Sequence, residues 1–189
     1  MHFIKIKDNI EKFNKVLSIE GDKSLSIRWA LLASQSKSKS RSINLLLSED
    51  VINTLKCLKK LGVKVKISKN FCEINGVGLN GFKYKKNLTL YAGNSGTLGR
   101  LIMGLLTHSE TTIKLKGDKS LSKRDFSRVS EPLKKFGAKF ITKLGKLPIK
   151  IKGTSKAHPI FYNETRGSAQ CKSAIMLAAL NTVGETIIK

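Results

Sequence analysis

The chain contains few aromatic residues and few cysteines, which disfavours base-stacking surfaces, disulfide frameworks and cysteine-based metal sites. Aromatics make up 6% of its 189 residues, which leaves few side chains for the base-stacking surfaces that bind single-stranded nucleic acid. The three cysteines, Cys57, Cys72 and Cys171, form no CxxC pair and are odd in number. We therefore expect reduced thiols in a cytoplasmic protein, without a disulfide framework. The three histidines show no metal-ligand spacing with these cysteines, and we predict no metal site.

Long apolar runs are also missing. No stretch approaches the roughly 20 apolar residues that a transmembrane helix needs. Residues 1–15 mix charged and apolar side chains and lack the apolar core of a signal peptide. These absences predict a chain that neither crosses a membrane nor carries a secretory signal.

Acidic residues are scarce, with 13 Asp and Glu against 36 Lys and Arg, and the net charge is +23. Such an excess suggests an anionic partner, whether nucleic acid, a membrane surface or a charged metabolite. Lysine outnumbers arginine and is scattered over every segment, as on a solvated surface, so the six arginines are more informative. Five of them lie in settings rich in Gly, Ser and Thr: Arg28, Arg100, Arg124, Arg128 and Arg166.

The octapeptide GDKSLSIR at 21–28 is the first of these settings. It follows a short apolar run predicted as a strand, Val16 to Ile19, and opens an apolar helix. A helix start carries free backbone N–H groups and the positive end of the helix dipole, so it favours anions. We expect Ser24 to cap the helix, while Lys23 and Arg28 add positive charge for a phosphate or carboxylate.

The periodicity of apolar residues predicts alternating strands and helices along the whole chain. Strands are expected at 3–7, 16–19, 41–47, 63–67, 71–74, 88–91, 112–116, 138–142, 148–152, 159–162 and 185–189. Helices are expected at 24–34, 48–61, 95–106, over a segment that ends at 136, and at 168–180.

This order contains an internal repeat. Gly21, Gly93 and Gly167 each precede the first helix of a round, 72 and 74 residues apart, and LKKLGVK at 58–64 matches LKKFGAK at 133–139, 75 residues later. Chance similarity between Lys-rich helix ends would not be expected to give nearly the same spacing for the glycines and for the LKK motif. We predict strand-helix-strand-helix-strand-strand units at about 15–80, 86–153 and 157–189, the third truncated.

If the units pack around a pseudo-threefold axis, three helix starts face one place. They carry short polar side chains and cations suited to small anions: Lys23, Ser24 and Arg28; Asn94, Ser95, Gly96 and Thr97; Ser168, Ala169 and Gln170. A second octapeptide, GDKSLSKR at 117–124, repeats the first at all but one position but is out of phase with the repeat. Its Arg124 is a further candidate for an anion contact.

Four motifs together resemble those of the 5-enolpyruvylshikimate-3-phosphate (EPSP) synthase family. They are GDKSLSIR at 21–28, GNSGTLGRL at 93–101, GDKSLSKR at 117–124 and GSAQCKSA at 167–174. The resemblance covers nearly the whole chain. It implies a mixed α/β (α+β) enolpyruvyl transferase-like domain of repeated βαβαββ units around a pseudo-threefold axis.

The resemblance also implies an activity, which is transfer of the enolpyruvyl group of phosphoenolpyruvate to the 5-hydroxyl of shikimate 3-phosphate, releasing phosphate. This reaction belongs to the shikimate pathway, which leads to chorismate and aromatic amino acids, and it uses no cofactor. The implied catalytic residue is Lys23, which would touch both substrates. The residues implied for shikimate 3-phosphate are Lys23, Ser24, Arg28, Ser168, Ala169 and Gln170, and those implied for phosphoenolpyruvate are Lys23, Asn94, Gly96, Arg124 and Gln170.

The chain departs from the family pattern in three respects. Asp125 stands where the family often has proline, and Ala169 where many members have serine. Family members are about twice as long, with a second domain that supplies acidic residues for proton transfer. We therefore expect residues 21–189 to be the N-terminal domain, residues 1–20 to lean on the second domain, and the complete enzyme to be a monomer. The 189 residues alone are expected to be an inactive fragment.

Two other functions remain as alternatives. The UDP-N-acetylglucosamine enolpyruvyl transferases are similar in fold, but they typically carry Lys-Asn in the first motif and a reactive cysteine in a mobile loop. This chain has Lys23-Ser24 and no cysteine within 110–125, and we expect Cys171 to pack inside a helix. The second alternative is a basic nucleic-acid-binding protein, which the charge favours and the shortage of aromatics disfavours.

Overall fold

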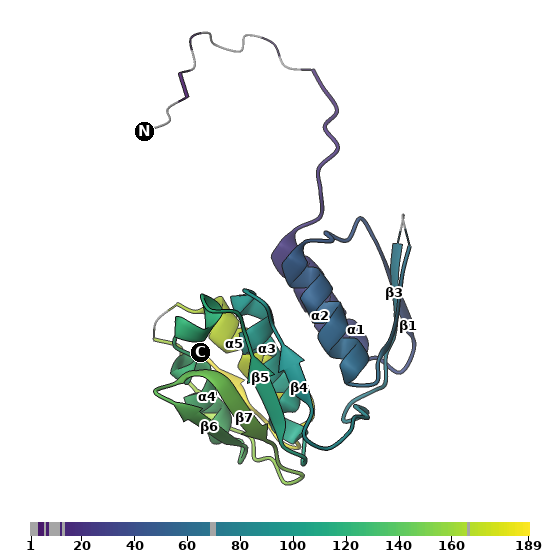
Figure 1. Ribbon diagram of the computed structural model, residues 1–189. Helices are drawn as coiled ribbons and strands as arrows, with labels where there is room; N and C mark the ends of the chain where they lie inside the picture. The colour runs from purple at the N-terminus through teal and green to yellow at the C-terminus, as the bar shows by residue number, and fades with distance from the viewer. Residues whose placement is uncertain (1–3, 6, 8–11, 13, 69–70, 166) are drawn as a thin grey trace.

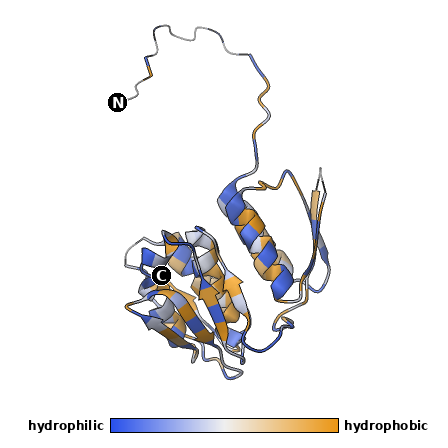
Figure 2. Cartoon of the chain, in the orientation of Figure 1, coloured by the Kyte–Doolittle hydropathy of each residue, from blue (hydrophilic) through white to orange (hydrophobic). Residues whose placement is uncertain are grey.

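The computed structural model describes residues 4–5, 7, 12, 14–68, 71–165 and 167–189 (Figure 1). The strand expected at 3–7 includes Phe3 and Ile6, which lie outside the described residues. The strand expected at 16–19 is wrong, because this segment pairs with no strand of the described chain. Val16, Leu17 and Ile19 are 101%, 66% and 76% exposed. Figure 1 shows the segment extending away from the packed elements, and Figure 2 shows that it still carries hydrophobic residues.

The first unit packs two helices against a three-stranded sheet. Its elements are α1 (Lys23–Ser34), β1 (Lys39–Ile43), α2 (Glu49–Lys60), β2 (Lys64–Ile67) and β3 (Phe71–Asn75). The sheet is antiparallel, in the order β1-β3-β2. The predicted apolar stripe of α2 is confirmed, since Val51, Leu55 and Leu58 are buried. Gly62 follows the helix with φ +90, a left-handed conformation that suits glycine.

The second unit has a four-stranded sheet covered by helices. Its elements are β4 (Thr89–Tyr91), α3 (Gly96–Leu105), the 3₁₀ turn η1 (Leu106–His108), β5 (Ile113–Lys116), the 3₁₀ turn η2 (Leu121–Lys123), α4 (Ser127–Lys134), β6 (Lys139–Lys143) and β7 (Lys146–Lys152). Strands lie in the order β4-β5-β7-β6, with β4 and β5 parallel and the others antiparallel. Burial alternates along β7, so Leu147, Ile149 and Ile151 enter the core while its lysines face outward.

The described remainder forms β8 (Phe161–Tyr162), α5 (Ala169–Ala179) and β9 (Ile187–Ile188). Strands β8 and β9 pair in parallel. Helix α5 packs closely against α3, because a Cβ on Gly104 of α3 would overlap the carbonyl oxygen of Ala174. The two helix backbones therefore touch, and Figure 1 shows α3 and α5 side by side.

The strand orders agree with the predicted repeat, with one correction. The β1-β3-β2 sheet has the same order and directions as β5-β7-β6, and the β8–β9 pair has the same direction as β4–β5. The first unit was expected to begin with the strand at 16–19, but no described strand occupies the position that β4 has beside β5. The pseudo-threefold axis itself stays a prediction.

Candidate anion-binding site

The first turns of α1, α3 and α5 meet at one hollow of about 340 Å³, which we call the anion hollow. Lys23 is the first residue of α1, Gly96 and Thr97 begin α3, and Gln170 is the second residue of α5. The free N–H groups and positive dipole ends of three helices therefore border the same space. The hollow is lined by Lys23, Asp50, Asn94, Gly96, Thr97, Arg100, Arg124 and Gln170.

The cap of α1 is Asp22, and the expectation that Ser24 caps this helix is wrong. The Asp22 carboxylate accepts a hydrogen bond from the Leu25 backbone N–H at 2.7 Å. The second octapeptide repeats this contact, since Asp118 accepts from the Leu121 N–H at 2.6 Å. The two similar octapeptides thus share a local role in which an aspartate starts a helical turn.

Side-chain caps also start the other two helices. Ser95 accepts from the Leu98 N–H at 3.2 Å, and Ser168 accepts from the Cys171 N–H at 3.3 Å. The second octapeptide is tied to the start of α3 as well, because the Asp118 N–H donates to the Gly93 carbonyl at 2.8 Å. This contact brings Arg124 to the anion hollow.

Three cations and one carboxylate line the anion hollow. Lys23 Nζ lies 3.3 Å from Asp50 Oδ2, and Arg124 Nη2 donates to Asn94 Oδ1 at 3.3 Å. Burial, and then repulsion from Arg124, lower the pKa of Arg100 from its usual value. Like charges are held close together here, which is unfavourable unless an anion joins them.

Arg100 connects α3 to α5 through Gln170. Its Nη1 donates to Gln170 Oε1 at 3.0 Å, and Gln170 Nε2 donates to Thr97 Oγ1 at 3.1 Å. Arg100 is one of the arginines singled out from the sequence, but no role was predicted for it, and Asp50 was not predicted to belong to the site. Arg100 lies four residues after Gly96, on the same helix face, and this spacing is the signal that would have identified it.

Gly96 leaves room for the ends of two arginines. A Cβ at this position would lie 2.7 Å from Arg100 Nη1 and 3.3 Å from Arg124 Nη1. Both atoms are ends of flexible side chains, so a methyl group would displace the cations without breaking the backbone. The absence of a side chain at Gly96 therefore allows both guanidinium groups to face the anion hollow.

Arg28 and its neighbours form a second group beside this hollow. The Arg28 guanidinium donates to Ser173 Oγ on α5, and Ser173 Oγ donates to the Ala169 carbonyl at 2.7 Å. All five residues predicted to hold phosphoenolpyruvate line the anion hollow. Of the residues predicted for shikimate 3-phosphate, Lys23 and Gln170 line it, whereas Ser24, Arg28, Ser168 and Ala169 do not.

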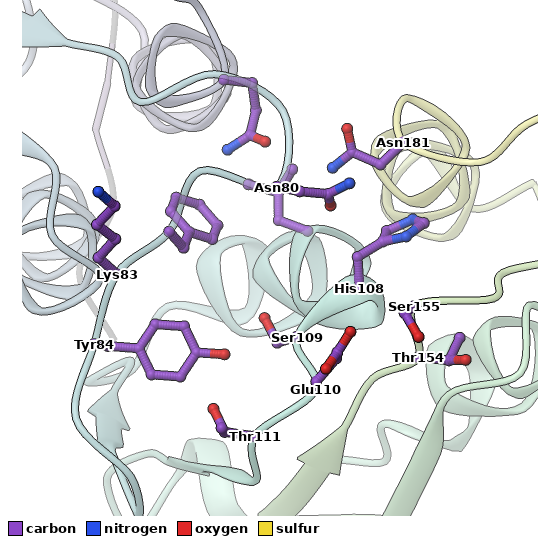
Figure 3. Close-up of a pocket in the computed structure, with 13 residues that line it drawn as sticks. Asn80, Lys83, Tyr84, His108, Ser109, Glu110, Thr111, Thr154, Ser155 and Asn181 are labelled. Carbon is purple, nitrogen blue, oxygen red and sulfur yellow. The ribbon is translucent and has the colours of Figure 1, made fainter.

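A larger hollow of about 560 Å³, the distal pocket, lies at the other ends of the same three helices (Figure 3). Gln35 caps the C-terminus of α1, His108 ends η1 after α3, and Asn181 follows α5. His108 Nε2 lies 2.9 Å from the Ala178 carbonyl oxygen. Glu110 and Lys83 also line this pocket, so its side-chain charges are mixed.

The described cysteines do not form a reactive or metal-binding group. Cys57, Cys72 and Cys171 are free and buried, which agrees with the expected packing role of Cys171 inside α5. Burial raises the pKa of Cys57 to about 11. Within the described ranges, no three His, Cys, Asp or Glu side chains are grouped as metal ligands would be. In the same ranges, no helix has the length and hydropathy required to span a bilayer.

The structure defines a mixed α/β protein with a candidate site for small anions, and comparison with known proteins identifies the family. The model of the EPSP synthase (3-phosphoshikimate 1-carboxyvinyltransferase) family matches residues 7–189. The chain belongs to this family.

Relatives and solved structures agree with this assignment. The 3-phosphoshikimate 1-carboxyvinyltransferases of Streptococcus agalactiae serotype Ia and Streptococcus mutans are 39% and 38% identical over 187 residues, covering 98% of this chain. The chain spans 44% of the length of these curated relatives. An EPSP synthase structure from Acinetobacter baumannii superposes with a TM-score of 0.86 at 35% identity, over 92% of this chain and 39% of that one.

Proposed function

We propose that this chain carries part of the substrate site of a 3-phosphoshikimate 1-carboxyvinyltransferase. The reaction transfers the enolpyruvyl group of phosphoenolpyruvate to the 5-hydroxyl of shikimate 3-phosphate and releases phosphate. The observation that supports this proposal most is the convergence of Lys23, Arg124 and the starts of three helices on one hollow. It is the arrangement that a small ligand with several negative charges requires.

The two groups of residues suggest a division of the site between the substrates. In the proposed mechanism, Arg124, Asn94, Gly96 and Gln170 hold phosphoenolpyruvate in the anion hollow. Arg28, with Ser24, Ser168 and Ala169, holds shikimate 3-phosphate beside it. Lys23 Nζ contacts both substrates and stabilises the negative charge that develops during addition.

Proton transfer is assigned to residues outside this set. Addition of the 5-hydroxyl requires a base that accepts the hydroxyl proton and an acid that protonates the methylene carbon of phosphoenolpyruvate. The carboxylate in the lining of the anion hollow, Asp50, is already paired with Lys23 at 3.3 Å. We assign the acid and base to the part of the relatives' length that this chain does not span, and we expect residues 1–20 to pack on that part.

The competing function, binding of nucleic acid through the net charge of +23, predicts different behaviour in solution. Calorimetric titration of the 189-residue chain with phosphoenolpyruvate and with shikimate 3-phosphate should give saturable binding at one site for each. Duplex DNA of unrelated sequence should bind only with a steep dependence on salt. Saturable DNA binding at 200 mM salt, without binding of either phosphate ester, would contradict the proposal.

A further inference from the structure

Arg100 contacts three segments that meet beside the anion hollow. Its Nη1 donates to Gln170 Oε1 at 3.0 Å, and its Nη2 donates to the Asp125 carbonyl at 3.3 Å. The guanidinium carbon lies 5.0 Å from the centre of the Phe126 ring. Arg100 is half-buried, so these contacts hold its planar group in one position.

The contact with Arg100 determines which way the Gln170 amide faces. A guanidinium group has only hydrogen-bond donors, so the atom opposite it must be the amide oxygen. The amide nitrogen is then placed 3.1 Å from Thr97 Oγ1, which accepts one of its two protons. The second N–H of the amide stays available at the lining of the anion hollow.

We propose that Arg100 is a positioning residue that holds the Gln170 amide with its NH₂ group toward the bound anion. The inference rests on the proposed function, because it takes the ligand to be the carboxylate and phosphate of phosphoenolpyruvate. In this orientation Gln170 donates a hydrogen bond to an anionic oxygen. The flipped amide would instead present its carbonyl oxygen to that anion, which is repulsive.

The geometry requires arginine and not merely a positive charge. The fork of N–H groups reaches Gln170 and the Asp125 carbonyl at the same time, whereas a lysine ammonium is a point charge on a flexible stem. Burial and the neighbouring Arg124 disfavour the charge of Arg100. The hydrogen bonds to Gln170 and the Asp125 carbonyl and the contact with the Phe126 ring offset that cost.

Asp125 supports the other end of this arrangement. Its carboxylate accepts from the Ser127 N–H and from Ser127 Oγ, both at 2.7 Å. These bonds hold the loop after Arg124 so that the Asp125 carbonyl faces Arg100. The family often has proline at this position, and its ring would restrain the backbone. In this chain the hydrogen-bonded carboxylate of Asp125 restrains the backbone instead.

The test is a double-mutant cycle on the affinity of the 189-residue chain for phosphoenolpyruvate, measured by titration calorimetry. Arg100→Lys keeps the charge, and we expect it to weaken binding about tenfold, as should Gln170→Ala, because each removes the directed amide bond. The double variant should bind about as weakly as either single variant. The matched control is Arg41→Lys, the same substitution on exposed β1, which should leave the affinity unchanged.

Two outcomes contradict the inference. One is an Arg100→Lys variant within twofold of the original affinity, and the other is a double variant whose loss is the product of the single losses. If Arg100→Lys does not fold, Thr97→Val tests the same amide from its other side and should weaken binding severalfold. Failure of the unsubstituted chain to bind phosphoenolpyruvate would overturn the proposed function and this inference together, whereas normal binding with an unaffected Arg100→Lys overturns the inference alone.

Discussion

The two ends of helices α1, α3 and α5 carry hollows of opposite character. At the N-terminal ends lies the anion hollow of about 340 Å³ with three cations, and at the C-terminal ends lies the distal pocket of about 560 Å³. The distal pocket lies at the negative ends of the helix dipoles, where His108 Nε2 is 2.9 Å from the Ala178 carbonyl oxygen. The negative end of a helix dipole disfavours anions, whereas the positive end with its free N–H groups favours them.

This difference predicts that helix direction, and not cavity size, decides where a phosphate ester binds. Side chains reinforce the direction, because Lys23, Arg100 and Arg124 line one end while Glu110 and Lys83 offset each other at the other. Removal of a side chain that lines the anion hollow should therefore weaken anion binding, whereas removal of one that lines the distal pocket should not.

The largest expected effect is complete absence of turnover in the 189-residue chain, because we assign the acid and the base to the part of the relatives' length that this chain does not span. Phosphate release should stay at the uncatalysed level when both substrates are present, although each binds. A colorimetric phosphate assay measures this directly. Turnover at the rate of a complete enzyme, typically about 1–1,000 per second, would contradict this assignment, because the acid and the base would then lie within these 189 residues.

Removal of a cation from the anion hollow should have the next largest effect. Arg124→Ala should weaken phosphoenolpyruvate binding about 30-fold, since a hydrogen bond to a charged group contributes about 1.5–3 kcal/mol. His108→Ala, in the distal pocket, is the control and should leave the affinity unchanged. Titration calorimetry at fixed salt measures both, and equal losses would remove the distinction between the two hollows.

Substitution of Arg28 tests the residues proposed to bind shikimate 3-phosphate beside the anion hollow. Arg28→Ala should weaken shikimate 3-phosphate binding about tenfold through loss of a charge-assisted contact. Lys64→Ala removes an exposed cation from β2 and should cost little, because exposed charges are screened by solvent. If titration gives the same loss for both variants, net charge and not the helix starts attracts the ligand.

Gly96→Ala should change stability and affinity in opposite directions. Gly96 does not have a positive φ, so alanine fits its backbone and should stabilise the chain by about 0.4–1 kcal/mol by restricting the unfolded state, and the melting temperature should rise slightly. The added methyl would lie 2.7 Å from Arg100 Nη1, so the affinity for phosphoenolpyruvate should fall about threefold. A variant that binds as tightly as the original chain would show that the arginine ends do not define the hollow.

The smallest expected effect depends on pH and concerns the support of Arg100. Hydrogen bonds from Ser127 Oγ and N–H lower the pKa of Asp125, so its contribution to stability is present above the ordinary aspartate pKa of about 4 and is lost as pH falls through the lowered value. The difference in melting temperature between the original chain and Asp125→Ala should therefore shrink below pH 4. Asp125→Asn keeps an acceptor and should show no such change relative to Asp125→Ala. A difference that grows on acidification would contradict this account.

Local patterns predicted most elements because they depend on neighbouring residues. The stripe of α2, the alternation of β7 and the starts of α3 and α5 all follow from side-chain periodicity and capping. The strand at 16–19 was predicted from a short apolar run, but the segment has no described partner, and a strand without a partner cannot form a ladder. Pairing is decided by distant parts of a chain, which no local pattern contains.

In the candidate site, too, local motifs predicted some residues, whereas other contacts depend on packing between distant parts of the chain. Lys23 and Gly96 were predictable from motifs at helix starts, because the physics of a helix terminus is local. The link from Arg100 to Gln170 joins residues 70 positions apart, and only the packing of α3 on α5 brings them together. Asp22 was overlooked as a cap because Ser24 is also a good capping residue, and the choice between them depends on where the helix begins.

The contact of Gly104 with Ala174 fixes the distance between α3 and α5 at one point. Because backbone meets backbone there, rotation of side chains cannot change the spacing of the two helices. Thr97 lies seven residues before Gly104, about 10 Å along the helix axis, and Gln170 lies one turn before Ala174. The contact therefore helps to set the separation of Thr97 and Gln170, which are joined by a hydrogen bond at the other end of this helix pair. The walls of the anion hollow that α3 and α5 supply are therefore held at a fixed separation, and the bond from Arg28 to Ser173 ties α1 to the same pair of helices.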